Sequence, residues 1–202
     1  MAHVHADTPF TPLGIAVLTV SDTRGIDQDG SGQLLIQRLT SSGHRLIERR
    51  IVPDDVYQIR AAVSAWVIRD DIHTILVNGG TGFTRRDTTP EALAPLLDKV
   101  VEGYGELFRQ LSYATIGTST IQSRALGGTI DRTLVFAMPG SPKACAMAWD
   151  DILQSQLDAR TRPCNFVAMV VENAAACATR SLGSDTPATA GTASTQAAGQ
   201  PA

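Results

Sequence analysis

The sequence predicts an α/β fold, a three-layer Rossmann-like domain in which helices cover both faces of a mostly parallel β-sheet. Short apolar and β-branched runs alternate with segments of helical periodicity, which is typical of parallel sheets. The run at 14–20 is β-branched and continuous, as expected for a strand that is buried on both faces. The chain has 202 residues, 43% of them hydrophobic, which is enough for one domain with a substantial core.

The first half of the predicted domain contains three strands with helices between them. The continuous β-branched run GIAVLTV at 14–20 predicts a strand, RLIERRIV at 45–52 predicts a second, and HTILVN at 73–78 predicts a third, buried strand. Helical periodicity predicts helices over 32–43 and 55–69. The second of these helices is expected to place the following apolar side chains on one face: Val56, Ile59, Val63, Trp66 and Val67.

The second half of the predicted domain contains three helices and a small β-hairpin. A Thr-Pro step predicts that one helix begins with Thr89 as its N-cap, and a further helix is expected over 104–114. Two short strands joined by a tight turn near Asp131 form the hairpin. A second step, Ser141-Pro142, begins a long last helix. The side chains of this helix that are expected to face inward are Cys145, Trp149, Ile152, Leu153 and Leu157.

The two ends of the chain differ in composition from the part between them. Residues 1–12 show no periodicity, which predicts a flexible N-terminal arm. Residues 13–172 form the predicted domain. Residues 173–202 are rich in Ala, Thr, Ser and Gly and contain a single large apolar side chain, Leu182, so that burial could not offset the entropy cost of ordering them. We therefore expect a disordered low-complexity tail.

Composition also argues against several classes of function. The net charge of −3 gives no broad cationic surface, so nucleic-acid binding is not expected. No apolar stretch approaches the roughly 20 residues that cross a bilayer, so no membrane association is expected either. The three cysteines contain no C-x-x-C pair, which argues against a disulfide framework or a structural zinc site. A reducing, cytoplasmic location fits this cysteine usage best.

Small and acidic residues gather at the predicted carboxyl ends of the strands. In sheets of this kind ligands bind beyond those ends, where successive loops meet at one edge. The four loops concerned span residues 19–23, 53–55, 78–87 and 138–141. The sequence therefore predicts a ligand cleft lined by these loops.

The most unusual of these loops is NGGTGFTRRDTTPEA, which begins at Asn78. It is not a Walker A loop, because no lysine follows a glycine at the required place, and it lacks the third glycine of a dinucleotide fingerprint. No G-x-S-x-G nucleophile motif occurs anywhere in the chain. The bare backbone at the glycines could let amide groups approach an anion, or the loop could be an ordinary turn that needs positive φ. The loop alone leaves both possibilities open.

Several polar residues of these loops have a purely structural alternative. Asp54 could be the N-cap of the helix that follows it, Asp22 could be a turn residue, and Ser141 could cap the last helix. Ser123 and Arg124 could simply begin a strand. A capping residue at a strand end still faces the cleft, so these alternatives do not exclude contact with a ligand.

Five motifs taken together resemble the MoaB/MogA family of molybdenum-cofactor biosynthesis proteins. In chain order they are LTVSDTR, VPDD, NGGTGFTRRDTTPEA, TSTIQSRALGG and AMPGSPKA, and the resemblance spans Leu13 to Phe166. GTSTIQSRALGG and the long stretch that begins AMPGSPKACAMAWDDI are more similar to the MoaB branch. The resemblance implies self-association as a homotrimer or as a homohexamer built from two trimers. It also implies contact with other proteins of the same pathway.

The resemblance further implies an activity, the Mg²⁺- and ATP-dependent adenylylation of molybdopterin with release of pyrophosphate. It implies that Asp54 and Asp87 are the catalytic residues and the ligands of Mg²⁺. The residues implied in binding molybdopterin and the nucleotide are Ser21, Asp22, Gly79, Gly80, Thr81, Gly82, Arg86, Ser123, Arg124, Pro139, Gly140 and Ser141. Some members of the MoaB branch replace the acidic residue after the glycine loop, and the retained Asp87 therefore supports an active enzyme. The alternative is a non-catalytic molybdopterin-binding or carrier protein of the same pathway.

Overall fold

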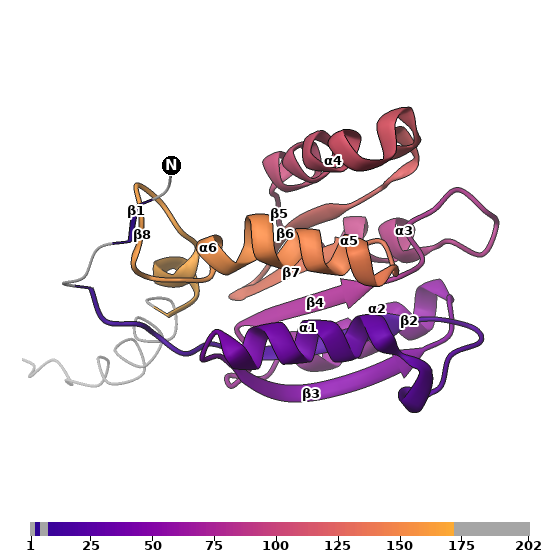
Figure 1. Cartoon of the computed structure of the whole chain (residues 1–202). Coiled ribbons are helices and arrows are strands. Elements are labelled where there is room, and N and C mark those ends of the chain that lie inside the picture. The colour runs from indigo at the N-terminus through magenta and orange to yellow at the C-terminus, as the bar shows by residue number, and fades with distance from the viewer. Residues whose placement is uncertain (1–2, 5–7, 172–202) are drawn as a thin grey trace, which may run out of the picture.

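A computed structural model describes residues 3–4 and 8–171, and the predicted tail at 173–202 lies outside them (Figure 1). The strands are β1 (His3–Val4), β2 (Gly14–Val20), β3 (Arg45–Val52), β4 (Thr74–Asn78), β5 (Lys99–Val100), β6 (Leu126–Ile130), β7 (Thr133–Met138) and β8 (Thr161–Arg162). The α-helices are α1 (Gly30–Ser41), α2 (Val56–Val67), α3 (Thr89–Leu93), α4 (Glu102–Ile116), α5 (Pro142–Met147) and α6 (Gln154–Gln156). A π-helix spans Ala148–Leu153, and short 3₁₀ segments span Ile26–Gln28, Ala94–Leu96 and Gly117–Gln122.

The main sheet has six strands in the order β3-β2-β4-β7-β6-β5. The pairs β2–β3, β2–β4 and β4–β7 are parallel, whereas β6 runs antiparallel to both β7 and β5. Every residue of β2, β4 and β7 is buried, as the unbroken apolar runs predict. The predicted α/β fold is therefore confirmed, and the predicted hairpin is the β6–β7 pair within the main sheet.

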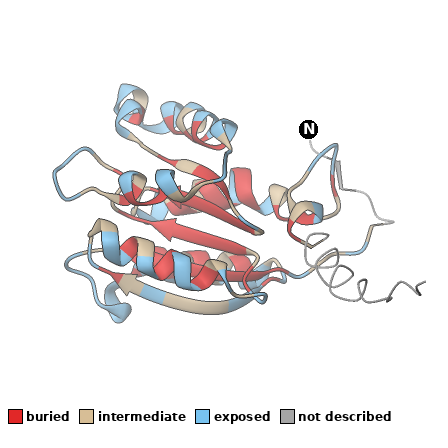
Figure 2. Cartoon of the chain, turned by 180° about the vertical axis from the view of Figure 1, so that it is seen from behind, coloured by how far each residue is buried: buried red, intermediate tan, exposed pale blue. Residues whose placement is uncertain are grey.

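Helices cover both faces of this sheet, as Figure 1 shows. One hydrophobic cluster packs α1, α4 and α5 against one face and includes Leu35, Phe108 and Trp149. The other packs α2 and α3 against the opposite face and includes Trp66 and Leu93. Figure 2 shows the buried strands between helices whose outer faces are exposed. The two clusters fix the strands, and with them the loops at their carboxyl ends.

The predicted helices at 32–43, 55–69 and 104–114 and the strand at 73–78 differ from the observed elements by one or two residues at their ends, and two larger departures have a physical cause. The N-cap of α3 is Thr88 and not Thr89, because the Thr89 hydroxyl instead donates a 2.9 Å hydrogen bond to the Gly79 carbonyl. The predicted long last helix is divided into α5, the π-helix and α6, and within the π-helix the adjacent Ile152 and Leu153 are both buried. Apolar periodicity alone does not distinguish a π turn from an α turn.

The predicted flexible arm makes defined contacts where the structure describes it. β1 pairs antiparallel with β8, so that His3 lies opposite Arg162. The Phe10 ring lies 5.1 Å from the His44 ring, and the Arg160 guanidinium stacks on Phe10 at 5.2 Å. Single side chains make these contacts, which explains why the segment shows no periodicity in its sequence.

The described residues bear on the expectations of no membrane-spanning segment and no disulfide framework. No helix among residues 3–4 and 8–171 is long and apolar enough to cross a membrane. Cys145 is buried and Cys164 is exposed, and both are free thiols. Burial raises the pKa of Cys145 to about 12, so this thiol stays protonated and unreactive at neutral pH.

The buried His44 leads to a first prediction, which concerns stability against pH. Its Nδ1 accepts a 3.2 Å hydrogen bond from the Leu13 N–H, and burial lowers its pKa from 6.5 to about 4, although Asp158 opposes the shift. Below pH 6.5 the unfolded chain takes up a proton that the folded chain refuses until about pH 4. Stability present at neutral pH is therefore lost as the pH falls through this window.

We expect His44 to contribute about 2 kcal/mol to this loss. Urea unfolding of the wild type and of His44→Asn, measured at neutral pH and near pH 4.5, would test it. Asparagine keeps an acceptor for the Leu13 N–H but does not titrate. The free energy of unfolding of the variant should therefore fall less on acidification, and an equal fall in both proteins would contradict the assignment.

Candidate active site

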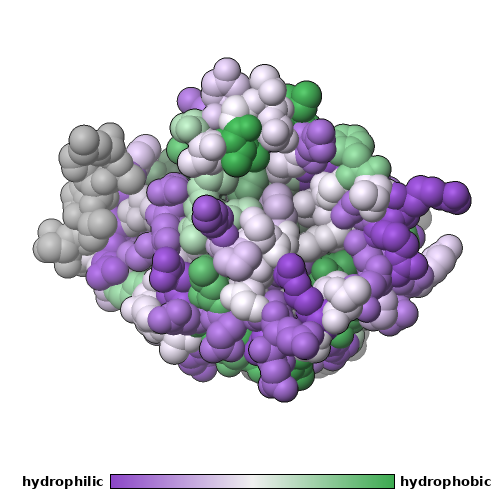
Figure 3. All heavy atoms as spheres, turned by 45° about the vertical axis from the view of Figure 1, so that its right-hand side comes forward, coloured by the Kyte–Doolittle hydropathy of each residue, from purple (hydrophilic) through white to green (hydrophobic). Residues whose placement is uncertain are grey.

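The loops at the carboxyl ends of β2, β3, β4 and β7 meet, as the sequence predicts. The Gly79 N–H donates to the Met138 carbonyl at 3.0 Å, and the Ser21 N–H donates to the Val52 carbonyl at 2.9 Å. The Asp54 N–H donates to Oδ1 of Asp22 at 3.0 Å. These bonds join the loop after β4 to the end of β7 and the loop after β2 to the loop after β3, and Figure 3 shows that this side of the molecule is predominantly hydrophilic.

The glycine loop needs both an unusual backbone conformation and the absence of side chains. Gly79 and Gly80 have φ values of +98° and +62°. A Cβ on Gly79 would lie 2.3 Å from the Val20 carbonyl oxygen, and one on Gly80 would lie 2.5 Å from Oδ2 of Asp54. The loop is therefore a tight positive-φ turn that also lies directly against a predicted catalytic carboxylate.

Asp54 is not the N-cap of α2. The N-cap is Asp55, whose Oδ1 accepts from the N–H groups of Tyr57 and Gln58. Asp54 instead reaches across the cleft, where its Oδ1 accepts from the N–H and the hydroxyl of Thr88 at 2.9 and 2.7 Å. Within the described part of the chain Oδ2 accepts no hydrogen bond, which leaves this oxygen available to a ligand.

Asp87 is held at the other end of the glycine loop. Its Oδ2 accepts a 2.8 Å hydrogen bond from the Thr84 N–H, and a Cβ on Gly82 would lie 2.7 Å from the same oxygen. Partial burial acts to raise the pKa of this carboxyl, but hydrogen bonds from Thr84 and Gly82 and the charge of Arg124 outweigh it and lower the pKa. Asp87 is therefore ionised at neutral pH.

The side chain of Arg124 hydrogen-bonds to the backbone of this loop. Its guanidinium donates to the carbonyls of Gly82 and Asp87, both at 2.8 Å, and pairs with the Glu91 carboxylate. It also stacks on the Phe83 ring at 5.0 Å. The sequence predicts Arg124 as a substrate-binding residue, whereas in the structure its donors are occupied by the protein. Arg124 therefore positions Asp87.

A second prediction follows from these contacts of Arg124. Replacing Arg124 with glutamine removes the fork that ties the two carbonyls together, so the amide hydrogens of residues 81–88 should exchange at least about 10-fold faster. Arg85→Gln is the matched control, because Arg85 is exposed and makes no hydrogen bond among the described residues. Hydrogen exchange followed by mass spectrometry measures both. An unchanged rate of amide hydrogen exchange in Arg124→Gln would show that the loop keeps its conformation without Arg124.

Arg86 forms the clearest link across the mouth of the cleft. Its Nε donates to Oδ2 of Asp22 at 2.9 Å, and its Nη2 donates to Oδ1 of the same carboxylate. The hydrogen bond from Arg86 lowers the pKa of Asp22, and the Asp54 N–H bond acts in the same direction. The Asp22–Arg86 pair thus joins the loop after β2 to the loop after β4.

Other predicted residues lie around this centre with mostly structural contacts. Oγ of Ser21 accepts from the Arg24 N–H at 3.1 Å, and Oγ of Ser141 accepts from the Ala144 N–H and caps α5, as its structural alternative predicts. Gly140 packs against Gly79, since a Cβ on Gly140 would lie 2.9 Å from the Gly79 Cα. Thr81 and the hydroxyl of Ser123 are buried, and the Ser123 hydroxyl has no partner among the described residues.

A series of hydrogen bonds between polar side chains, which the sequence did not predict, lies beneath the cleft. Asn78 donates to the Thr19 hydroxyl at 2.9 Å, which donates to Oδ2 of Asp29 at 2.7 Å. The same oxygen accepts from Arg49 at 2.9 Å, and the Asp29 side chain is fully buried. These hydrogen bonds stabilise the floor of the cleft. Polar residues at the ends of otherwise apolar strands were the available signal for them.

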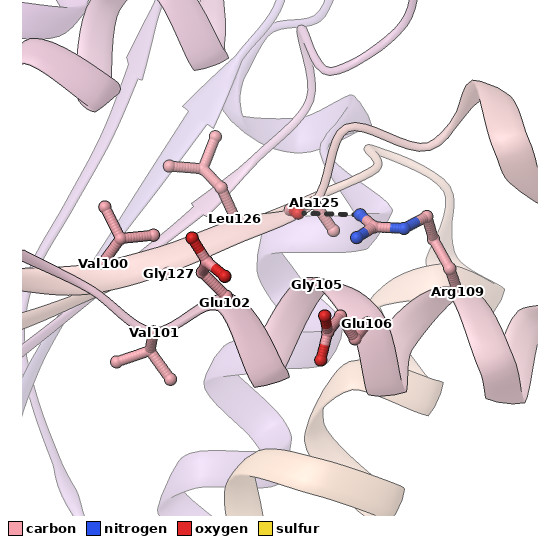
Figure 4. A pocket seen from close by; sticks show the side chains of 9 residues that line it. All are labelled: Val100, Val101, Glu102, Gly105, Glu106, Arg109, Ala125, Leu126 and Gly127. Carbon is pink, nitrogen blue, oxygen red and sulfur yellow. Dashed lines mark hydrogen bonds between the residues drawn. The ribbon is translucent and has the colours of Figure 1, made fainter.

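The cavities of the described structure lie mainly beside α4. Figure 4 shows one of about 250 Å³, lined by Glu102, Glu106 and Arg109 of α4 and by the facing backbone of β6. None of the predicted site residues lines it. A larger cavity of about 590 Å³ between α4 and α5 includes Ser141 and so borders the fourth loop of the cleft.

These features define a Rossmann-like α/β domain with an acidic, glycine-lined cleft at the carboxyl edge of its sheet, and similarity to known proteins narrows the class. Residues 16–159 match the family described as "Probable molybdopterin binding domain". Molybdenum cofactor biosynthesis protein B of Escherichia coli (strain K12) is 55% identical over 159 residues, which cover 79% of this chain and 94% of that protein. The Bacillus cereus protein of the same name is 47% identical over 142 residues, which cover 70% of this chain and 84% of that protein.

Solved structures agree with this relationship. A crystal structure of molybdenum cofactor biosynthesis protein B has a TM-score of 0.73 at 41% identity and covers 81% of this chain and 96% of that one. The tungsten cofactor synthesizing protein MoaB from Pyrococcus furiosus has a TM-score of 0.65 at 35% identity, with coverages of 72% and 92%. The chain therefore belongs to the MoaB/MogA family of molybdenum-cofactor biosynthesis proteins, as its motifs predict.

Proposed function

We propose that this protein catalyses the Mg²⁺- and ATP-dependent adenylylation of molybdopterin. A role in molybdenum-cofactor biosynthesis follows from membership of the family. The observation that carries the finer proposal is that two carboxylates border one glycine loop. Oδ2 of Asp54 lies 2.5 Å from the Cβ position of Gly80, and Oδ2 of Asp87 lies 2.7 Å from that of Gly82.

The proposed reaction is an adenylyl transfer, which is a nucleophilic substitution at the α-phosphorus of ATP. An oxygen of the terminal phosphate of molybdopterin attacks the α-phosphorus of ATP, and the bond from that phosphorus to the bridging oxygen breaks, so that pyrophosphate leaves. The nucleophile is already anionic at neutral pH and needs no general base. The placement of His44 and His73 agrees with this, because they accept hydrogen bonds from the N–H groups of Leu13 and Gly14, at the opposite end of β2.

The donor set suits Mg²⁺ as the metal that this reaction needs. The described residues contain no group of three or more His, Cys, Asp or Glu side chains arranged to hold a metal ion. Mg²⁺ is usually held by only one or two carboxylates, together with water and substrate phosphates, and Asp54 and Asp87 provide that number. When bound, the ion would offset the repulsion between the two phosphate-bearing substrates.

The residues of the chain provide the positioning in this proposal. The N–H groups of Gly80 and Thr81 bind a phosphate of the nucleotide, whereas the Gly79 N–H is held by the Met138 carbonyl. Asp54 and Asp87 fix the polyphosphate in line for displacement. Ser21 and Asp22 line the nucleotide end of the cleft. Ser123 and the turn from Pro139 to Ser141 line the pterin end, where the cavity of about 590 Å³ offers room for the organic part of the substrate.

Self-association is a further part of the proposal. Apolar side chains are exposed on α4 and the turn after it: Leu107, Tyr113, Ile116 and Ile121. Exposed apolar groups of this kind are typical of protein interfaces, which supports a homotrimer or a homohexamer. Sedimentation equilibrium would distinguish these assemblies, and a monomer at micromolar concentration would remove this part of the proposal. We also propose that other proteins of the pathway bind to this surface.

The activity is tested by the dependence of pyrophosphate release on molybdopterin. The wild type is incubated with ATP and Mg²⁺, with and without molybdopterin, and pyrophosphate is measured enzymatically. We expect release only when all three components are present. Tight binding of molybdopterin without any release of pyrophosphate would instead support the carrier function.

A further inference from the structure

The Asp22–Arg86 pair occupies the place where a polyphosphate would be expected to bind. Arg86 comes directly before Asp87, on the glycine loop that is proposed to bind a phosphate. Its side chain is 67% exposed, yet both arms of its fork contact one carboxylate. An arginine fork binds a phosphate through the same two-point geometry that it uses for a carboxylate.

We propose that Asp22 acts as an internal substitute for phosphate, which Arg86 releases when a polyphosphate enters the cleft. This inference rests on the proposed function, and it names Arg86 as the residue that recognises the polyphosphate chain of the nucleotide. In the described structure the pair is the resting state. In the occupied state the same two N–H donors bind non-bridging oxygens of a phosphate.

The exchange is favourable on three grounds. The pair is exposed, with Asp22 one-third accessible, and exposed ion pairs contribute little to stability. A terminal phosphate carries more charge than a carboxylate and therefore competes well for the fork. The released Asp22 also keeps a partner, because its Oδ1 still accepts from the Asp54 N–H at 3.0 Å.

The exchange would also change the connection between the loops. In the resting state Arg86 is linked to Asp22, Asp22 to Asp54, and Asp54 to Thr88, so that the contacts form a closed ring across the mouth. Releasing Arg86 breaks the ring at one point and leaves the Asp54–Thr88 contacts in place. The catalytic carboxylates therefore stay positioned while the mouth opens.

The proposal predicts an increase in affinity on removing an acidic group. Asp22→Asn should bind inorganic tripolyphosphate, in the presence of Mg²⁺, about 3- to 10-fold more tightly than the wild type, because Arg86 no longer has a charged competitor. Arg86→Gln should bind it about 10-fold more weakly. Isothermal titration calorimetry measures both affinities without molybdopterin, so the result does not depend on turnover.

A double variant separates the exchange from a general loss of negative charge. If Asp22→Asn acts by freeing Arg86, its gain disappears in the Arg86→Gln background. If it only relieves repulsion, the same gain persists there and the proposal fails. Weaker binding by Asp22→Asn alone would also overturn the proposal, because it would make Asp22 a direct ligand.

The matched control is Asp71→Asn. Asp71 makes the same kind of exposed two-point pair with Arg69, with contacts of 2.9 and 2.8 Å, but it lies beside Gly14 at the amino end of the sheet. The affinity of the Asp71→Asn variant for tripolyphosphate should equal that of the wild type. The result is also separable from the proposed function. If the predicted affinities were found but no adenylylation occurred, the exchange at Arg86 would be supported and the transferase activity would be excluded. If adenylylation occurred but the affinities did not change as predicted, the transferase activity would be supported and the exchange would be excluded.

Discussion

Asp87→Asn is expected to lower the rate of molybdopterin adenylylation by about 100- to 1000-fold. Asparagine fills the same space, and its carbonyl oxygen can still accept the 2.8 Å hydrogen bond from the Thr84 N–H. The variant therefore removes the charge and keeps the shape of the loop. Affinity for molybdopterin should stay within about three-fold of the wild type, because the lost interaction acts mainly in the transition state.

Single-turnover kinetics and equilibrium binding measure these two quantities separately. Asp71→Asn is again the control, since it removes one exposed aspartate at the far end of the sheet and should keep the full rate. If Asp87→Asn retained the wild-type rate, Asp87 would have no catalytic role. If rate and affinity fell together, Asp87 would be a binding residue only.

Gly80→Ala is expected to reduce adenylylation by about 100-fold or more, since displacement of a catalytic group by about 1 Å has effects of this size. The added Cβ would lie 2.4 Å from Oγ1 of Thr89 and 2.5 Å from Oδ2 of Asp54. These contacts push the Asp54 carboxylate from its place. The φ of +62° adds strain, so unfolding should also become easier by about 2 kcal/mol.

Two glycine variants serve as controls for strain and for the loss of glycine itself. Gly117 has a φ of +57°, but a Cβ there meets nothing within 4 Å. Gly117→Ala should therefore lose about 1 kcal/mol of stability and keep full activity. Gly103→Ala, in the first turns of α4 with open space around it, should leave both properties nearly unchanged. Activity lost equally in Gly80→Ala and Gly117→Ala would show that strain alone is responsible.

Much of the fold follows from local patterns in the sequence. β2 and β3 have the predicted bounds: β2 is an unbroken run of small, aliphatic and β-branched residues, whereas β3 mixes apolar with charged residues and is an edge strand of the sheet. The cap of α5 is also predictable, since a Ser-Pro step has one common geometry. The error at Thr89 arose because two threonines precede the proline, and only the Gly79 carbonyl decides between them.

The site was predictable in its location but less so in its contacts. The loops meet because strand order brings the carboxyl ends of β2, β4 and β7 together. Adjacent aspartates at 54 and 55 look alike in sequence, and the contact of Asp54 with a residue 34 positions away separates their roles. Arg124 and Arg86 likewise differ only through partners 42 and 64 positions away in the chain. Such distant contacts leave no local pattern.

The proposed activity of this cleft is the transfer of an adenylyl group to molybdopterin. The most direct test uses ATP labelled at the α-phosphorus, with Mg²⁺, molybdopterin and the wild-type protein, followed by separation of the products. We expect the label to appear in adenylylated molybdopterin, with one pyrophosphate released for each label transferred. Label that stays in ATP or appears only in free AMP, while molybdopterin binds tightly, would contradict it.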